Sequence, residues 1–181
     1  MGTHDFPPVL DVLRAAEAQL ELSGQTHLSH FSRLLAQFGP KASRRALNWK
    51  ARFAIRQSSS LHDEAWLELS IQSSLPLICQ RCLGEFECPV EAEQVFRFVA
   101  DENIAQQEDD ESVEDLLVLS RAFDLAELIE DEVIMGLPIM PRHELCPRPL
   151  ARSAADRDFD QATGKENPFA ALAQLKKDKA H

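Results

Sequence analysis

Cysteines are the residues with the clearest capacity for chemistry in this chain of 181 residues. Three of the four lie in the stretch LICQRCLGEFECP, where Cys79 and Cys82 form a Cys-x-x-Cys pair followed by Gly84. This arrangement resembles a zinc knuckle, in which a tight turn directs two thiolates at one metal ion. A closed structural zinc site needs four ligands, and the second pair with the same spacing is His143 and Cys146.

Two other interpretations of the Cys-x-x-Cys pair remain open from the residues alone. A thioredoxin-type dithiol lies between a strand and a helix that lowers a thiol pKa, whereas predicted strands flank this pair on both sides. Alternatively, the cysteines are small apolar side chains at a strand turn, which is a common role of free cysteine. Cys88 is a weaker ligand candidate, because its place in a predicted strand does not direct it toward the turn.

The elements that position this turn are strands with alternating apolar residues. Such alternation predicts a strand over 47–55 and another over 66–72, with the pattern continuing through 74–79. It also predicts one or two strands over 86–100 with a break at Pro89, and a short edge strand over 116–120. Helical spacing of apolar residues predicts helices over 7–22, over 28–38 with a cap at Ser29, and over 124–135. Asp124 and Glu127 are spaced as in a capping box. A final helix over 167–178 begins with Asn167 as its cap.

These elements define an α+β fold class. We expect an antiparallel sheet or partly open barrel, flanked by the N-terminal helices, the 124–135 helix and a short C-terminal helix. Residues 1–150 are predicted to form a single domain with an acidic loop over 101–115. Residues 151–166 read as a flexible linker and residues 167–178 as a C-terminal helical motif.

Charge is unevenly distributed along this chain of net charge −11. The net charge argues against broad, non-specific binding of nucleic acid. A local basic face remains compatible with it, since the stretch from 41 to 56 carries no acidic residue. Its basic residues are candidate phosphate contacts to RNA, with ordinary solubility charge as the alternative: Lys41, Arg44, Arg45, Lys50, Arg52 and Arg56.

Three adjacent acids, Glu130, Asp131 and Glu132, lie on the otherwise apolar helix predicted at 124–135. A solvated helix face is the simpler interpretation, and general acid–base chemistry lacks support from any cofactor or nucleophile motif. The chain is therefore not expected to be an enzyme. It has no apolar run of membrane-spanning length and no signal peptide at its start, so a cytoplasmic protein is expected.

Three stretches in combination resemble the bacterial YceD family of large ribosomal RNA subunit accumulation proteins. They are CQRCLGEFECPVEAEQVFRFV, then DLAELIEDEVIMGLPIMPRHELC, and finally NPFAALAQLKK. The resemblance implies a non-enzymatic role in the synthesis, processing or stability of 23S ribosomal RNA, and hence in cytoplasmic assembly of the large subunit.

In this interpretation the protein binds precursor rRNA or the immature large subunit. The alternative is an acidic adaptor or chaperone for a basic large-subunit ribosomal protein. Cys88 falls outside the family motif, which leaves His143 and Cys146 as the better partners of Cys79 and Cys82 for a structural Zn²⁺. The candidate partner-binding residues are Glu130, Asp131, Glu132, Asn167, Phe169, Leu172 and Leu175.

Overall fold

The computed structural model describes residues 2–57 and 63–147. The predicted linker at 151–166, the predicted helix at 167–178 and the candidate residues Asn167, Phe169, Leu172 and Leu175 lie outside this part of the chain. The strands are β1 (Gly2–His4), β2 (Val9–Leu10), β3 (Glu21–His27), β4 (Ala46–Gln57), β5 (Asp63–Ile78), β6 (Glu85–Val99), β7 (Asp115–Val118) and β8 (Phe123–Asp124). The helices are α1 (Val12–Glu17), α2 (Ser32–Phe38), α3 (Glu102–Glu108) and α4 (Leu125–Met135), with short 3₁₀ turns η1 (Leu28–His30) and η2 (Pro40–Ala42).

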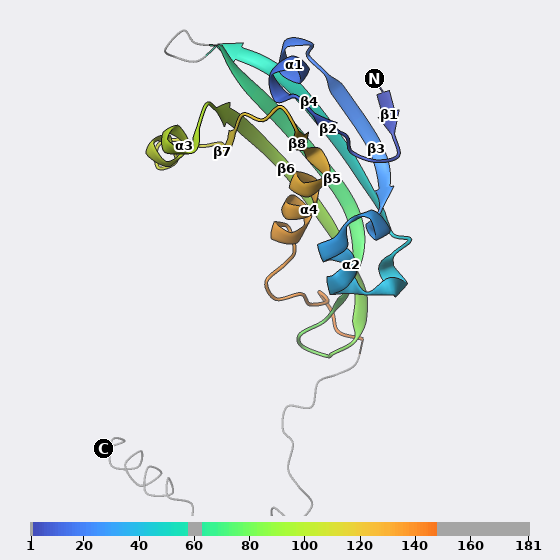
Figure 1. Cartoon of the computed structure of the whole chain (residues 1–181). Coiled ribbons are helices and arrows are strands. Elements are labelled where there is room, and N and C mark those ends of the chain that lie inside the picture. The colour runs from blue at the N-terminus through green and yellow to red at the C-terminus, as the bar shows by residue number, and fades with distance from the viewer. Residues whose placement is uncertain (1, 58–62, 148–181) are drawn as a thin grey trace, which may run out of the picture. The chain divides into compact units, whose positions relative to one another are not determined.

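The main sheet has six strands in the order β1-β3-β4-β5-β6-β7. Its four long central strands are antiparallel, and a short parallel strand borders each side. Figure 1 shows the long strands β4, β5 and β6 running side by side through the described unit. The predicted α+β class with an antiparallel sheet is confirmed, and the sheet is not closed into a barrel.

One face of this sheet is buried beneath helices and the other is open. On β4 the odd-numbered residues Trp49 and Phe53 are buried, whereas Lys50 and Arg52 on the opposite face are exposed. Helices α1, α2 and α4 contribute apolar side chains to the core against the buried face. Burying one such large side chain stabilises the fold by about 1.5–3 kcal/mol.

The predicted N-terminal helices are shorter than expected. Instead of a helix over 7–22, the chain forms the six-residue α1 and then β3, because Gln19 adopts φ of 49° and turns the chain into the sheet. The alternation in β3 is hidden in the sequence by its polar residues. The second helix begins at Ser32 with Phe31 at its cap position, so the expected cap at Ser29 is wrong.

The long strands are continuous. The alternation predicted over 66–72 and continuing through 74–79 lies in the single strand β5, whereas the predicted break at Pro89 is wrong, because β6 runs through it. Proline is tolerated there because the part of β6 that precedes Phe96 in the sequence pairs only with β5 and is an edge of the sheet within the described residues. Helix α4 matches its predicted range, and Asp124 caps it by accepting bonds from the N–H groups of Ala126 and Glu127.

The region expected to be an acidic loop contains helix α3, so that expectation is wrong for residues 102–108. Asp101 caps the helix by accepting bonds from two backbone N–H groups. The side chain of Arg97, only 11% exposed, pairs with Glu64, Glu108 and Glu114. This guanidinium holds the acidic segment against β6. Within the described ranges, no helix is both long and apolar enough to span a bilayer.

Candidate metal centre and surrounding surfaces

The four predicted metal ligands come together at one end of the β5–β6 hairpin. The thiols of Cys79, Cys82 and Cys146 and a ring nitrogen of His143 all lie within 4.8 Å of one another. The Sγ atoms of Cys79 and Cys146 are 3.8 Å apart, and Cys82 Sγ is 3.4 Å from His143 Nδ1. Two segments that lie about 60 residues apart in the chain therefore supply one cluster.

The turn between β5 and β6 presents the first pair. The N–H of Cys79 donates to the carbonyl of Gly84 at 2.9 Å, and the N–H of Leu83 donates back to Cys79 at 2.8 Å. Leu83 adopts φ of 57°, a left-handed conformation that costs about 1–2 kcal/mol for a residue with a Cβ. A bound metal would help to stabilise this strained turn.

Contacts between protein groups hold the segment after α4 beside this turn. The N–H of Gln80 donates to the carbonyl of Pro141 at 2.8 Å. The guanidinium of Arg81 contacts Cys146 Sγ at 3.1 Å and the carbonyl of His143 at 3.3 Å. The ring of Phe86 packs on that of His143, with centroids 4.8 Å apart. These contacts orient the second pair of ligands.

The cluster favours thiolate at one of its cysteines. Burial alone would raise the pKa of Cys79. The N–H groups of His143, Cys82 and Arg81 donate to its sulfur and outweigh the effect of burial, so the pKa falls to about 5. Thiolate is the form of cysteine that binds metal. Cys88, in contrast, lies outside the cluster, its thiol donates to the carbonyl of Pro89, and burial raises its pKa.

This donor set fits zinc. Tetrahedral Zn²⁺ with Zn–S near 2.3 Å and Zn–N near 2.05 Å separates two sulfurs by about 3.8 Å and a sulfur from a nitrogen by about 3.5 Å. The two measured contacts, 3.8 Å and 3.4 Å, agree with these separations. Cys79, Cys82, His143 and Cys146 could thus hold one ion as a closed Cys₃His site without large movement.

The six basic candidate residues do not form one patch. They extend from η2 along β4, and a strand of this length spans about 40 Å. Arg45 forms an ion pair with Glu87, and both Arg52 and Arg56 pair with Glu68. Lys41, Arg44 and Lys50 form no ion pair within the described ranges.

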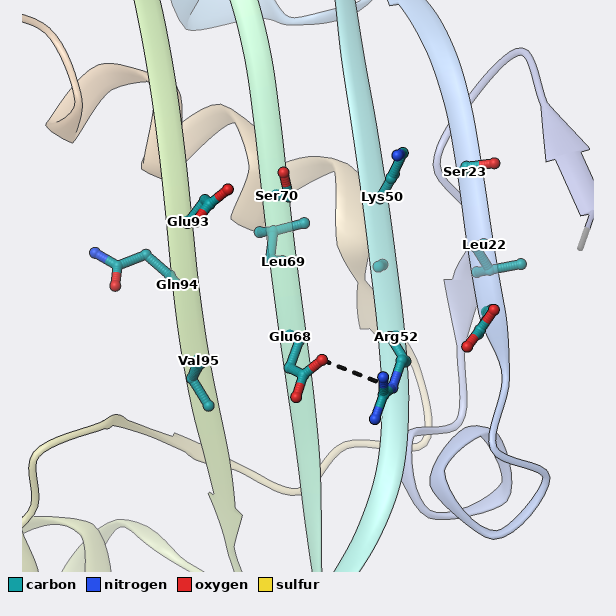
Figure 2. Close-up of a pocket in the computed structure, with 12 residues that line it drawn as sticks. Leu22, Ser23, Lys50, Arg52, Glu68, Leu69, Ser70, Glu93, Gln94 and Val95 are labelled. Atoms are coloured by element: carbon teal, nitrogen blue, oxygen red, sulfur yellow. Dashed lines mark ion pairs between the residues drawn. The ribbon is translucent and has the colours of Figure 1, made fainter.

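Figure 2 shows the open face of the sheet, where Arg52 and Glu68 meet across neighbouring strands. A hollow of about 520 Å³ extends over this face from β3 to β6. Its rim carries both signs of charge, since Lys50 and Arg52 line it together with acids that include Glu21 and Glu93. The open face is therefore mixed in charge rather than basic.

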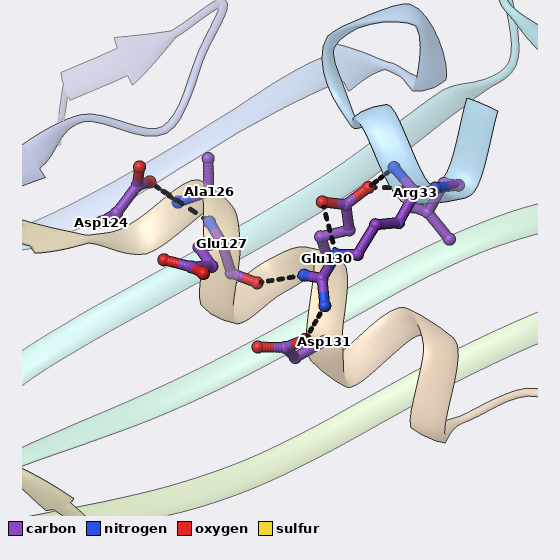
Figure 3. Close-up of polar contacts among 7 residues, drawn as sticks. Arg33, Asp124, Ala126, Glu127, Glu130 and Asp131 are labelled. Carbon is purple, nitrogen blue, oxygen red and sulfur yellow. Dashed lines mark hydrogen bonds and ion pairs between the residues drawn. The ribbon is translucent and has the colours of Figure 1, made fainter. Parts of the chain in front are cut away.

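The three adjacent acids on α4 are not a solvated face, contrary to expectation, because Glu130 and Glu132 are each only 7% exposed. Glu130 accepts bonds from the backbone N–H groups of Arg33 and Leu34, at 2.6 and 2.9 Å. These groups begin α2, whose own cap residue Phe31 provides no side-chain bond. Figure 3 shows the Arg33 guanidinium reaching Glu130, Asp131 and the carbonyl of Glu127.

The third acid, Glu132, has a different environment. It forms no hydrogen bond or ion pair with another described residue, and although the residue is only 7% exposed, its carboxylate oxygens are not fully shielded from solvent. Burial raises its pKa, and the nearby carboxylates of Asp115 and Asp131 raise it further. The candidate Glu130–Asp131–Glu132 set thus divides into two acids engaged by Arg33 and one that has no partner in the described chain.

Two residues that contact the predicted site residues were not predicted from the sequence. Arg33 has no local signal, because its partners on α4 are about 97 residues away. Arg81 could have been found, since it lies inside the Cys-x-x-Cys pair and contacts the fourth ligand.

Fold and site together define a class: an α+β protein whose curved open sheet carries a Cys₃His cluster of zinc-knuckle type at its end. A sequence profile described as "Large ribosomal RNA subunit accumulation protein YceD" matches residues 67–176, and the chain belongs to this family. The matched range contains all four clustered ligands.

A curated relative carries the same description. The "Large ribosomal RNA subunit accumulation protein YceD" of Haemophilus influenzae is 32% identical over 114 residues, which is 59% of this chain and 62% of the relative. The match thus covers less than two thirds of the relative's length. No solved structure matches the chain. The family name connects the protein with accumulation of the large ribosomal RNA subunit.

Proposed function

We propose that this protein is a non-enzymatic ribosome-biogenesis factor that supports the synthesis, processing or stability of 23S ribosomal RNA in the cytoplasm. The observation that carries the proposal is the family match over 67–176, which spans the Cys₃His cluster and α4. The factor acts by binding precursor rRNA or the immature large subunit.

The Cys₃His cluster serves this function as a structural centre that binds Zn²⁺. All four ligand positions are filled by protein side chains, whereas a catalytic zinc site keeps one position for water or substrate. The ion fixes the end of the β5–β6 hairpin and the segment after α4. Leu83, Ile139 and Leu145 near the cluster are 75%, 100% and 88% exposed, so this end presents apolar side chains to a partner.

Two binding modes follow from the charges. In the first, RNA phosphates contact the basic residues of 41–56, above all Lys41 and Arg44, because these lack ion pairs within the described ranges. In the second, acidic surfaces bind a basic ribosomal protein. The second is supported by the pairing of Arg45, Arg52 and Arg56 with glutamates, which leaves three of the six basic residues without an ion pair in the described ranges.

A pull-down of assembling large subunits tests the function. We expect the tagged protein to recover large-subunit precursors rather than mature subunits or small subunits. Absence of such precursors, in cells where large-subunit assembly is slowed, contradicts the proposal.

Gel-shift experiments with purified components then separate the two modes. If RNA is bound through Lys41 and Arg44, the variant K41E/R44E weakens binding to a 23S fragment and lowers the salt slope by about 2. The matched control R14E/R121E makes the same change in net charge at two other exposed arginines. Equal loss in both variants, or no RNA shift with the parent protein, removes the RNA mode.

A further inference from the structure

The N-terminal part of β6, from Glu85 to Val95, is an open edge of the sheet within the described residues. Strand β7 pairs only with residues 96–99, so from Glu85 to Val95 the side of β6 that faces away from β5 has no neighbour within the described residues. In an antiparallel strand, alternate residues direct their N–H and C=O groups to that side. Figure 2 shows Gln94 pointing outward past β6. The stretch from Val90 to Val95 contains no proline and can form a regular ladder.

Unneutralised acids border this edge on the open face of the sheet. Glu91 lies opposite Gln72 on β5 and Glu93 lies opposite Ser70, so neither carboxylate faces a base on the neighbouring strand. Both side chains are exposed and form no ion pair with a described residue. Glu87, in contrast, is paired with Arg45. Negative charge is therefore concentrated along Val90–Val95.

Another exposed carboxylate, that of Asp115, stands at the end of this edge. Asp115 pairs with Phe96 as the first residue of β7 and so marks the point where the edge opens. Glu132 of α4 lies close enough to Asp115 for that charge to raise its pKa. Glu132 as a whole is 7% exposed, but its carboxylate oxygens are not fully shielded from solvent. A cation beside Asp115 and Glu132 would offset the repulsion between these two carboxylates.

We propose that the edge of β6 over Val90–Val95 binds an extended, Lys/Arg-rich segment of a partner protein, which adds to the sheet as a strand in line with β7. Backbone hydrogen bonds to β6 supply the pairing. Basic side chains on one face of the added strand lie beside Glu91 and Glu93, and a basic residue at its end lies beside Asp115. Opposite charges on neighbouring strands stabilise such pairs.

The same charges exclude other occupants. A second copy of β6 would place glutamates against glutamates, and like charges directly opposite destabilise a sheet. RNA phosphates would meet the same carboxylates. The inference deepens the second of the two proposed binding modes, in which a basic protein is bound, by naming its surface and the conformation of the bound segment.

A synthetic peptide of alternating Lys and Val tests this proposal with the full chain. Titration followed by fluorescence anisotropy is expected to show saturable binding, and hydrogen exchange is expected to slow at Val90–Val95. Two control peptides separate the contribution of charge from that of backbone hydrogen bonds. The first has Glu in place of each Lys. The second has Pro in place of each Val, which keeps the charge but removes half of the backbone donors. Both are expected to bind at least about tenfold more weakly.

The variant E91K/E93K should weaken binding of the Lys/Val peptide about tenfold, because it replaces attraction by repulsion at two positions. The matched control D109K/D110K changes two exposed acids away from the edge by the same charge and should bind normally. Equal weakening in both variants, or equal binding of the Pro-containing peptide, overturns the proposal, since attraction would then depend on net charge alone. Slower exchange on adding RNA instead of peptide overturns it as well. The result is independent of whether large-subunit precursors are recovered in the pull-down.

Discussion

A single carboxylate determines how α2 and α4 are joined. Glu130 occupies the position of a helix cap for α2, although it belongs to a helix far away in the sequence, and it also binds the Arg33 side chain. Asp131 binds the same guanidinium, but its side chain is 45% exposed. Exposed ion pairs contribute little, whereas an unpaired buried donor is costly.

This difference predicts unequal effects of substitution. Glu130→Ala removes the acceptor of one buried and one partly buried N–H group and should lower the free energy of unfolding by about 2 kcal/mol. Asp131→Asn should lower it by less than about 1 kcal/mol. Urea denaturation of both variants measures the effect. If Asp131→Asn is the more damaging change, Glu130 does not act as the cap of α2.

At the scale of the element, the acidic region after β6 is a helix with an anchor. Helix α3 is short and contributes no fully buried residue, so its own burial cannot hold it in place. The mostly buried guanidinium of Arg97 reaches Glu108 on α3, Glu114 after it and Glu64 on β5. One cation thus organises three carboxylates from separate elements.

Arg97→Gln should therefore release α3 while leaving the sheet folded. Loss of the cation leaves three acids close together, and removing one partner of such partly buried pairs costs about 1–3 kcal/mol. Hydrogen exchange should become faster at residues 102–115, with little change in β4 and β5. Arg121→Gln, at an exposed arginine without an ion pair in the described ranges, provides the control. Unchanged exchange over 102–115 in Arg97→Gln would show that α3 is held by other contacts.

The sequence predicts those elements whose signals are local. Alternation along β4 and the cap at Asp124 are both decided by residues within a few positions, and both predictions are confirmed. Strand β3 and helix α3 were missed because their sequences are polar and their stability comes from partners elsewhere, namely β4 and Arg97. Burial of Glu130 was missed for the same reason, since its partner Arg33 lies in another helix.

The candidate metal site was more predictable than the surfaces. Equal spacing in the Cys79–Cys82 and His143–Cys146 pairs indicated four ligands of one ion, and the fold brings the two pairs together. The basic stretch gave no sign of its glutamate partners, because Glu68 and Glu87 lie on other strands of the sheet. Whether those bases contact RNA stays a prediction.

At the scale of the whole molecule, metal content and stability should change together. We expect protein purified without chelator to contain close to one zinc per chain, and Cys82→Ser to lose most of it with a lower Tm. Cys88→Ser removes a cysteine outside the cluster and should keep both metal and Tm. Elemental analysis and thermal unfolding provide the readouts. A parent protein free of zinc, or equal metal loss in Cys88→Ser, excludes a Cys₃His zinc site.

The cluster also has a topological consequence. Cys82 and His143 are 61 positions apart, and the chain between them includes β6, α3, β7, β8 and α4. An ion bound by both pairs would close this length of chain into a ring, as a disulfide does. Chain-entropy arguments give a cross-link around a ring of this size a stabilisation of about 4 kcal/mol, because the unfolded chain loses most of its freedom. One ion at the end of a hairpin would thereby join the folding of a third of the protein into one cooperative event.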